Sequence, residues 1–137
     1  MPKHSPIPDE VDKPFWDACN EDRLIMQNCT ACDRMQYPPE KQCSNCDSGD
    51  HLDWREVSGS GKIYGYGVIY DCPIKSLQPD QPFNLAVIQL DEDPGVLLYS
   101  HLPGTPLDEV PIGGTVRAIF HTTPGTGQKV CEWEVIG

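Results

Sequence analysis

Four of the chain's seven cysteines stand in two Cys-x-x-Cys pairs, Cys29/Cys32 and Cys43/Cys46, which are separated by ten residues. Each pair can bring two sulfurs close together, and four thiolates suit the tetrahedral shell of Zn²⁺. Four protein ligands leave no position open for water or substrate, whereas catalytic zinc keeps one open. We therefore predict a structural Zn²⁺ site, with iron in the same four-thiolate shell as the alternative.

The other residues that could do chemistry are scattered. His51 follows Cys46 closely, but it would be a fifth ligand, so a surface or second-shell role is favoured. We interpret Cys19 and Cys131 as small buried hydrophobes and Cys72, in a loop, as the one plausible exposed thiol. No phosphate-binding loop, Gly-x-Ser-x-Gly or His-Glu-x-x-His motif occurs. Catalysis by this chain alone is not visible in the sequence.

Composition limits the classes of protein that fit. The 137 residues suit one domain, or a small metal module joined to a compact core. The first residues, MPKHSPIPDEVDK, do not resemble a signal peptide and no stretch suits a membrane helix, so we expect a cytoplasmic protein with no membrane partner. In that compartment an odd number of cysteines argues against a disulfide framework. A formal charge of −11 argues against polyanionic partners.

The elements that must position the cysteines begin with residues 1–8, which could be a mobile or partner-bound arm, although a disordered tail is favoured. A short helix is expected from Asp12, with Asp12 as its cap, Pro14 in the first turn, and Phe15, Trp16 and Cys19 on one face. Strands are predicted at 24–26 and 35–37 around the first pair, and alternation predicts another at 52–57. We place the boundaries at 1–22 for arm and helix, 23–56 for the ribbon and 57–137 for the rest.

Past residue 61 the texture changes to five β segments separated by turns: 62–71, 83–93, 96–102, 115–123 and 128–136. Gly65 and Gly67 within the first segment indicate a sharply coiled strand. Residues 83–90 are almost continuously apolar and should be the most buried strand. A long Pro/Gly-containing connection at 103–114 is typical of a five-stranded OB barrel. The predicted fold class is thus mainly β, with an N-terminal helix, a rubredoxin-like zinc ribbon and a five-stranded OB-fold barrel.

The order of motifs carries a family resemblance over about residues 15–120. PFWDACNEDRLIMQNC precedes the first cysteine pair and PPEKQCSNC holds the second; LDWREVSGSGKIYGYGVIY, FNLAVIQLDE and IGGTVRAIFH follow. This resembles the thiolase-associated zinc-ribbon and OB-fold family, labelled domain of unknown function thirty-five. Asp33 and Asp47 stand where many members have glycine after each pair, and aspartate tolerates the left-handed conformation needed there.

The resemblance implies a non-catalytic accessory subunit. Such subunits pair with thiolase-like proteins that carry the catalytic residues for thiolysis or retro-aldol cleavage of acyl-CoA substrates. They support the partner's fold and help to shape the passage for the acyl-CoA. Phe15 and Trp16 are then candidates for the partner interface, with packing in the core as the alternative. Lys62, Lys75, Arg117 and Lys129 are the candidate CoA contacts, with solvated surface bases as the alternative.

Two other functions stay open. An OB barrel with a zinc ribbon could bind single-stranded nucleic acid through Tyr64, Tyr66 and Tyr70, but the acidic charge disfavours it and the tyrosines could simply pack the barrel. An autonomous enzyme using Cys72 is the least favoured. The acyl-CoA, the choice between thiolysis and aldol cleavage, and the stoichiometry are left undetermined.

Overall fold

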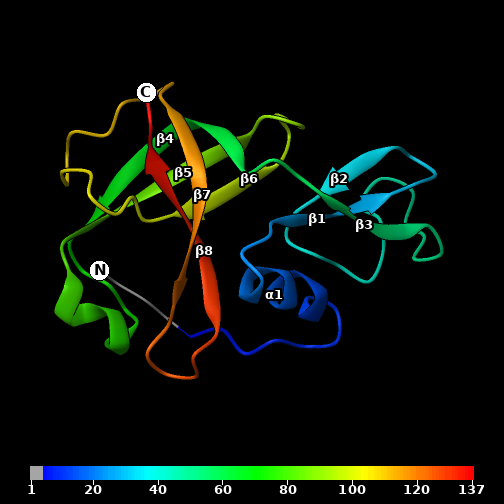
Figure 1. Ribbon diagram of the computed structural model, residues 1–137, viewed down its shortest axis with the longest axis horizontal. Coiled ribbons are helices and arrows are strands. Elements are labelled where there is room, and N and C mark those ends of the chain that lie inside the picture. The colour runs from blue at the N-terminus through cyan, green and yellow to red at the C-terminus, as the bar shows by residue number, and fades with distance from the viewer. Residues whose placement is uncertain (1–4) are drawn as a thin grey trace.

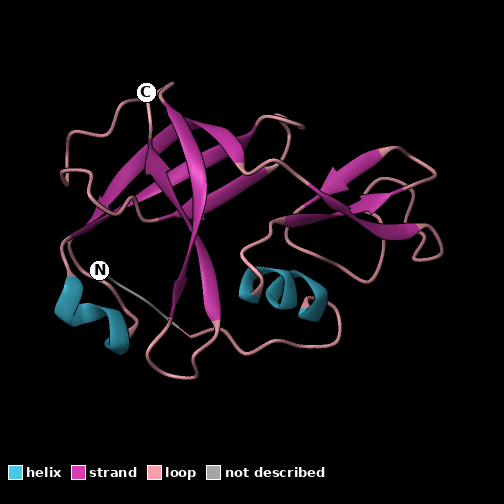
Figure 2. Ribbon diagram, viewed as in Figure 1, coloured by secondary structure: helices cyan, strands magenta, loops and turns pink. Residues whose placement is uncertain are grey.

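The computed structural model describes residues 5–137 and is mainly β (Figures 1 and 2). Its elements in chain order are α1 (Lys13–Asn20), β1 (Ile25–Cys29), β2 (Arg34–Gln36), β3 (Leu52–Glu56), β4 (Ser60–Ile69), the 3₁₀ helix η1 (Lys75–Asp80), β5 (Phe83–Leu90), β6 (Leu97–Ser100), β7 (Thr115–Thr122) and β8 (Lys129–Val135). The chain thus forms a short helix, a three-stranded sheet with the cysteine pairs and a five-stranded curled sheet. This arrangement confirms the predicted fold class. No helix within the described residues is long and apolar enough to cross a membrane.

Helix α1 begins as the sequence predicts, except for its cap. Pro14 lies in the first turn, where a missing N–H does no harm. Asp12 occupies the N-cap position, but its carboxylate does not cap the helix and instead accepts the N–H of Asp9, at 2.7 Å. Asp9 in turn accepts the N–H groups of Val11 and Asp12 through its side chain. The prediction that Asp12 caps α1 is therefore wrong, because the local turn at Asp9 takes up its side chain.

The three-stranded sheet has the order β2-β1-β3 and is antiparallel, with strands close to the predicted positions. Gln27 on the central strand is only 5% exposed, and both the nitrogen and the oxygen of its side-chain amide are hydrogen-bonded. Its amide donates to the carbonyl of Glu40 at 2.8 Å, and its oxygen accepts from the backbone of Glu40 and the side chain of Gln36. This residue therefore fixes the loop between the two cysteine pairs to the middle of the sheet.

The five-stranded sheet has the order β6-β5-β4-β7-β8, with every neighbouring pair antiparallel. Within the described chain its edge strands β6 and β8 do not form a ladder. The backbone N–H of Trp133 on β8 instead donates to Oγ of Ser100 on β6, at 3.1 Å. The sheet is thus a curled half-barrel of the OB type, which Figure 1 shows as the crossing of β7 and β8 over the other three strands.

Strand β4 contains the bend that Gly65 and Gly67 predict. Its register with β5 shifts between Ile63 and Gly65, which leaves Tyr64 unpaired and 63% exposed. Tyr66 packs against the core, and its hydroxyl donates to the carbonyl of Asp108 at 3.0 Å. Because of the bulge, Tyr64 points to solvent while Tyr66, two residues later on the same strand, packs inward.

The main core lies inside the half-barrel and extends to α1 and the small sheet. Strand β5 begins with two buried residues and then alternates between half-buried and buried ones with none exposed, so it is the most buried of the five barrel strands, as predicted. The largest fully buried side chains include Trp133, Met26, Ile63, Ile88, Leu90 and Leu102. Met26 belongs to β1, so the small sheet shares this core instead of forming a separate one.

Helix α1 is held against the start of β8 by a polar network. The amide of Gln128 donates to the carbonyl of Trp16 and to Oδ1 of Asn20, both at 3.1 Å. Asn20 also accepts the backbone N–H of Lys129, whose ammonium group lies 2.7 Å from Asp22. The helix therefore packs against the barrel, although in the sequence it directly precedes the strand that leads to the first cysteine pair.

The connection from β3 to β4, residues 57–59, is hydrogen-bonded on both sides. The N–H of Val57 donates to Leu24, and the carbonyl of Gly59 accepts from Ala118 at 2.7 Å. Gly59 has φ +80°, and a Cβ there would lie 3.2 Å from Cβ of Ala118, so both conformation and space call for glycine. This joint, the segment from Val57 to Ser60, leaves little freedom between the two sheets.

The arm predicted at 1–8 is only partly open to inspection, because residues 1–4 lie outside the described residues. Ser5 donates to Oγ1 of Thr123 at 2.8 Å and accepts the N–H of Thr126. Residues 6–8 line a shallow hollow with the turn between β7 and β8, while the side chain of Ile7 is 87% exposed. The described part of the arm therefore lies along the barrel.

Candidate metal centre

The four paired cysteines meet at one end of the small sheet. Cys29 ends β1, Cys32 lies in the turn to β2, and Cys43 and Cys46 lie in the loop before β3. All four sulfurs lie within 4.8 Å of one another. Sγ of Cys29 is 3.9 Å from that of Cys46, and Sγ of Cys43 is 3.9 Å from that of Cys32. A tetrahedral zinc with Zn–S bonds of about 2.3 Å places its sulfurs about 3.8 Å apart, so the cluster fits structural Zn²⁺.

Both turns that form the cluster need a left-handed residue directly after the second cysteine of the pair. Asp33 and Asp47 take this conformation, with φ of 53° and 58°. The N–H of Asp47 donates to the carbonyl of Cys43 at 2.9 Å, which closes the second turn. The prediction that aspartate could stand at these positions without disturbing the cysteine geometry is thus supported by the backbone.

Asn45 connects the two pairs, and the sequence analysis did not identify it. Its side-chain amide donates to Sγ of Cys32 at 3.3 Å, and its backbone N–H donates to Sγ of Cys43 at 3.4 Å. Arg34 in turn donates to Oδ1 of Asn45 at 2.8 Å, which orients the amide. Hydrogen bonds of this kind hold ligands in position and stabilise thiolate charge. The only sequence signal was an asparagine within the second Cys-x-x-Cys turn.

The electrostatics of the cluster call for a cation. Backbone N–H groups of Cys46 and Asn45 lower the pKa of Cys43 to about 7. The backbone N–H of Ser48 lowers the pKa of Cys46, but its contacts with the thiols of Cys32, Cys43 and Cys29, together with burial, outweigh this and raise the pKa to about 12. Four adjacent thiols cannot all ionise without a positive charge between them. A bound Zn²⁺ would supply that charge and hold all four as thiolates.

No second metal centre accompanies this one in the part of the chain that the structure describes. His51 is exposed and does not belong to the cluster, as the sequence analysis favoured. Its backbone carbonyl accepts the N–H of Thr30 at 2.9 Å, so it supports the first cysteine turn from the neighbouring strand. The four sulfurs leave no ligand position for a substrate, and the site is suited to holding the fold.

The remaining thiols are all shielded. Cys72 is only 5% exposed and packs with Leu77 and Phe83 beneath η1, so the prediction of an exposed thiol is wrong. Side chains of Gln81 and Gln78 bind its backbone and fold the loop over it. Burial raises the pKa of Cys19 to about 12 and that of Cys131 well above its usual value. Cys19 is a small buried residue, as expected, while Cys131 is half-buried and packs against the core.

The two aromatic residues proposed for a partner interface differ in exposure. Phe15 is 3% exposed and packs edge-on against Trp16 and tilted against Tyr37, with ring centroids 5.0 and 5.6 Å apart. Phe15 therefore packs in the core, which was the alternative to its predicted place in a partner interface. Trp16 is half-buried, and its indole N–H has no hydrogen-bond partner within residues 5–137. Only Trp16 remains accessible enough for the predicted interface.

The four candidate CoA contacts do not form one basic patch. Arg117 lines a cleft of about 390 Å³ at the joint and pairs with Glu134. Lys62 on β4 donates to Thr115, and Lys129 pairs with Asp22 near α1. Lys75 begins η1, at the opposite end of β4 from Lys62. Among the described residues the tyrosines are also divided, since Tyr64 and Tyr70 are exposed while Tyr66 packs inward.

Two family models match the chain in consecutive segments. The rubredoxin-like zinc ribbon domain of ChsH2 matches residues 16–51, and the C-terminal OB-fold domain of ChsH2 matches residues 54–121. A chain of the solved Ltp2-ChsH2(DUF35) aldolase superposes with a TM-score of 0.79 at 26% identity, covering 96% of this chain and 98% of that one. A DUF35 family protein of unknown function from Sulfolobus solfataricus shares the fold, with a TM-score of 0.62 at 18% identity over 93% of this chain and 86% of that one.

Two curated proteins add sequence similarity. A "Probable enoyl-CoA hydratase alpha subunit" of Thermomonospora curvata is 34% identical over 103 residues, which are 74% of this chain but only 31% of that protein. A "DUF35 domain-containing scaffold protein" of Methanocaldococcus jannaschii is 29% identical over 97 residues, which are 71% of this chain and 67% of that protein. The chain belongs to the ChsH2, or DUF35, family, in which a rubredoxin-like zinc ribbon precedes an OB-fold domain.

Proposed function

We propose that this chain is the non-catalytic, zinc-binding subunit of a thiolase-like complex that processes acyl-CoA by thiolysis or retro-aldol cleavage. The observation that carries the proposal is the match along almost the whole of both chains to the DUF35 component of the Ltp2-ChsH2 aldolase. A complete match of this kind favours an equivalent role beside a catalytic partner. The cytoplasmic location and the domain boundaries given above remain predictions.

The side chains of the described residues support an accessory role. Nucleophilic catalysis by cysteine needs an accessible thiolate next to a base. Cys72 is buried, and the raised pKa values of Cys19 and Cys131 keep those thiols protonated at neutral pH. Four thiolates around one zinc would bind no substrate. In this proposal the partner supplies the catalytic groups, while the chain stabilises the partner and contributes surface to the acyl-CoA passage.

Co-expression with a thiolase-like protein from the same host tests the proposal. We expect the two chains to co-purify and native mass spectrometry to detect a defined hetero-oligomer. Cleavage of a CoA thioester should require both chains, and Cys72→Ser in this chain should leave the rate unchanged. A chain that stays monomeric beside every thiolase-like protein of its host would contradict the proposal. Turnover by the isolated chain that Cys72→Ser abolishes would contradict it too.

The similarity to a probable enoyl-CoA hydratase subunit favours a second candidate. In that protein the similar region accounts for about a third of the length, and the chain could likewise serve a hydratase that acts on acyl-CoA. The same co-purification separates the two candidates through the reaction that the complex performs. Hydration of an enoyl-CoA without C–C cleavage would assign the chain to a hydratase.

A further inference from the structure

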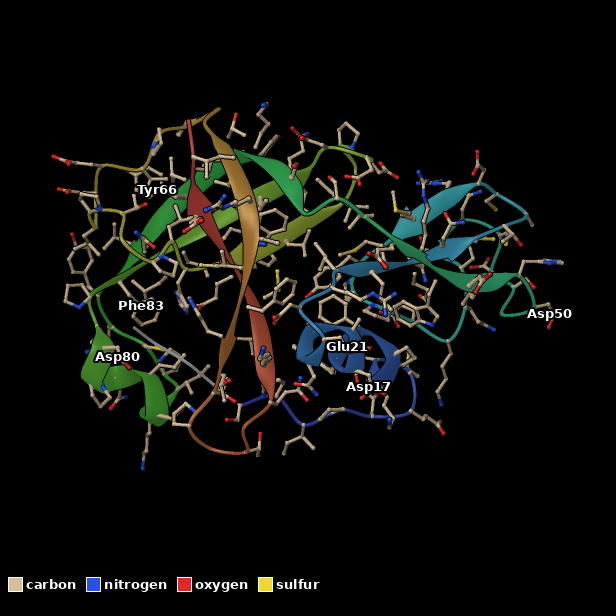
Figure 3. The ribbon with its side chains drawn as sticks, viewed as in Figure 1. Asp17, Glu21, Asp50, Tyr66, Asp80 and Phe83 are labelled. Atoms are coloured by element: carbon tan, nitrogen blue, oxygen red, sulfur yellow. The ribbon has the colours of Figure 1, made fainter. Side chains whose placement is uncertain are left out.

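Strand β6 is an edge of the five-stranded sheet, and a cleft lies beside it. The sheet order ends at β6, so no strand of the described chain pairs with its outer side. The cleft has a volume of about 440 Å³ and is lined by Tyr37, Pro38, Gly95, Leu97 and Tyr99. Tyr37 and Pro38 follow β2, so the cleft lies between β6 and the ribbon. In Figure 3, Asp80 and Phe83 lie beside η1 at the far end of the half-barrel from Asp50 on the ribbon, so η1 does not cover this edge.

The backbone of β6 directs hydrogen-bonding groups toward this open side. The N–H of Leu90 donates to the carbonyl of Val96 at 3.1 Å, and the register of β5 with β6 continues from there. In an antiparallel pair the hydrogen-bonded residues alternate along each strand, so the even-numbered residues of β6 bond to β5. Leu97 and Tyr99 therefore point their N–H and C=O groups away from β5, and Tyr99 is 67% exposed. The edge thus offers alternating backbone donors and acceptors to a further strand.

The surroundings of this edge are uncharged in the cleft and acidic at one end of it. The described lining of the cleft contains no charged residue. The turn from β5 to β6 carries Asp91, Glu92 and Asp93, and no lysine or arginine within residues 5–137 forms an ion pair with them. A Cβ placed on Gly95 would lie 3.2 Å from Oδ1 of Asp93, so this carboxylate lies at the end of the cleft. An apolar side chain with a positive charge beside it would complement both features.

An extended peptide supplies backbone donors and acceptors along one side, which is how a strand adds to an exposed sheet edge. A second copy of this chain would also bring an edge strand, but each copy has a formal charge of −11 and its own acidic turn, so like charges oppose that pairing. We propose that β6 binds an extended segment of a partner protein as an additional strand, with an apolar side chain in the cleft and a lysine or arginine beside Asp93. This inference goes beyond the proposed function and does not rest on it, because β6, the cleft and the acidic turn all belong to this chain.

Nuclear magnetic resonance of the ¹⁵N-labelled, zinc-loaded full chain tests the edge with the probe peptide acetyl-Lys-Val-Thr-Val-Lys-amide. We expect saturable shifts of the backbone amides of Leu97 and Tyr99 at millimolar peptide, with slower hydrogen exchange at both, because their N–H groups gain acceptors. The acidic counterpart acetyl-Glu-Val-Thr-Val-Glu-amide should bind at least about threefold more weakly at low salt. No saturable shift with the basic peptide, or equal binding of the two peptides, overturns the proposal and leaves the proposed function untouched.

Methylation of the peptide's backbone nitrogens tests the strand geometry from the side of the ligand. Since hydrogen-bonding groups of successive residues in a strand point to opposite sides, only alternate N–H groups of the peptide can reach β6. We therefore expect methylation of both valine nitrogens and methylation of the threonine nitrogen to differ, so that one abolishes binding and the other is tolerated. Equal effects of the two changes would contradict strand addition.

Two variants of the chain separate binding at this edge from binding elsewhere. Leu97→Pro removes an outward N–H at the first residue of an edge strand, a position that tolerates proline, and it should weaken peptide binding by up to about tenfold. Leu97→Val keeps the N–H and is the matched control. Asp93→Asn keeps the oxygen that accepts the N–H of Gly95 at 3.0 Å but removes the charge, and it should weaken binding by about two- to fivefold, with Asp50→Asn as its control.

The outcomes of these variants decide between a partner segment and the other occupants of the edge. Equal binding of the basic peptide by folded Leu97→Pro and Leu97→Val would overturn the proposal, and the methylated peptides decide if Leu97→Pro does not fold. Sedimentation of the free chain tests the second copy. A dimer that Leu97→Pro dissociates would assign the edge to self-association and overturn the proposal too.

Discussion

The ribbon, β1 to β3 with the four-cysteine cluster, and the half-barrel, β4 to β8, are held together in different ways. In the half-barrel, β4, β5, β7 and β8 enclose fully buried side chains such as Ile63, Ile88 and Trp133. In the ribbon, β2 and β3 are mostly exposed or half-buried, and only β1 is buried along most of its length. So few residues cannot bury a sufficient core, and a metal takes its place. Because Met26 and Met35 of the ribbon also reach the core of the half-barrel, we expect the ribbon to depend on both the ion and this shared core, and the half-barrel to depend on its core alone.

Removing the metal should have the largest effect, and it should fall on the ribbon. Cys43→Ser, or chelation of zinc, would leave clustered thiols without a cation, and structural zinc contributes about 10–16 kcal/mol of binding free energy in small finger peptides. We expect amide hydrogen exchange to lose protection across β1–β3 while β5 and β8 stay protected. Loss of protection in both regions together would show that the half-barrel also depends on zinc. Cys72→Ser, outside the cluster, is the control for replacing a cysteine.

The reverse perturbation removes Trp133 from the barrel core. Trp133→Ala should lower the free energy of unfolding by about 3–5 kcal/mol, because a fully buried indole leaves a cavity. Denaturant unfolding monitored by circular dichroism measures the loss. Zinc content, measured by colorimetric release, should remain one ion per folded chain. If the variant lost zinc while still folded, the division between the two regions would be wrong.

Asn45→Ala tests the hydrogen bonds around the cluster without removing a ligand. Loss of an interaction that orients metal ligands typically costs about 10–100-fold in metal affinity. We expect competition with a chelator to show a weaker zinc affinity of this order, with a small change in barrel stability. The exposed residue Asp50, in the turn before β3, provides the control variant Asp50→Ala. Equal affinities of the two variants would mean that the amide of Asn45 contributes nothing to the site.

The smallest effect is expected where α1 meets the half-barrel. Gln128→Ala removes donors to Trp16 and Asn20, and net hydrogen bonds of this kind contribute about 0.5–1.5 kcal/mol each. Thermal unfolding should shift down by a few degrees, and exchange protection should fall mainly in α1. Thr122→Ala, at an exposed residue that ends β7 beside the same turn, is the matched control. A loss of zinc affinity in Gln128→Ala would show that α1 couples the two regions more tightly than its contacts suggest.

Much of this arrangement could be predicted because its signals are local. The spacing of Cys29, Cys32, Cys43 and Cys46 indicates the cluster, and alternation with turn residues indicates the strands. Burial of Cys72 could not be predicted, because it depends on two glutamines that fold the loop back onto itself. The closure of the half-barrel by Ser100 and Trp133 joins residues far apart in the sequence, and the side chain of Asn45 acts on a sulfur of the other pair. The periodic pattern of apolar and polar residues along the sequence gives no information on such contacts.

The joint at Val57 to Ser60 has a mechanical consequence. A segment hydrogen-bonded on one side to Leu24, just before β1, and on the other side to β7 cannot rotate freely. A partner that binds the half-barrel therefore also determines the orientation of the four-cysteine end of the ribbon. Inserting one glycine after Gly59 would shift that angle while leaving both sheets intact. The orientation of the ribbon thus depends on the backbone hydrogen bonds of Val57 and Gly59, together with the core that β1 shares with the half-barrel.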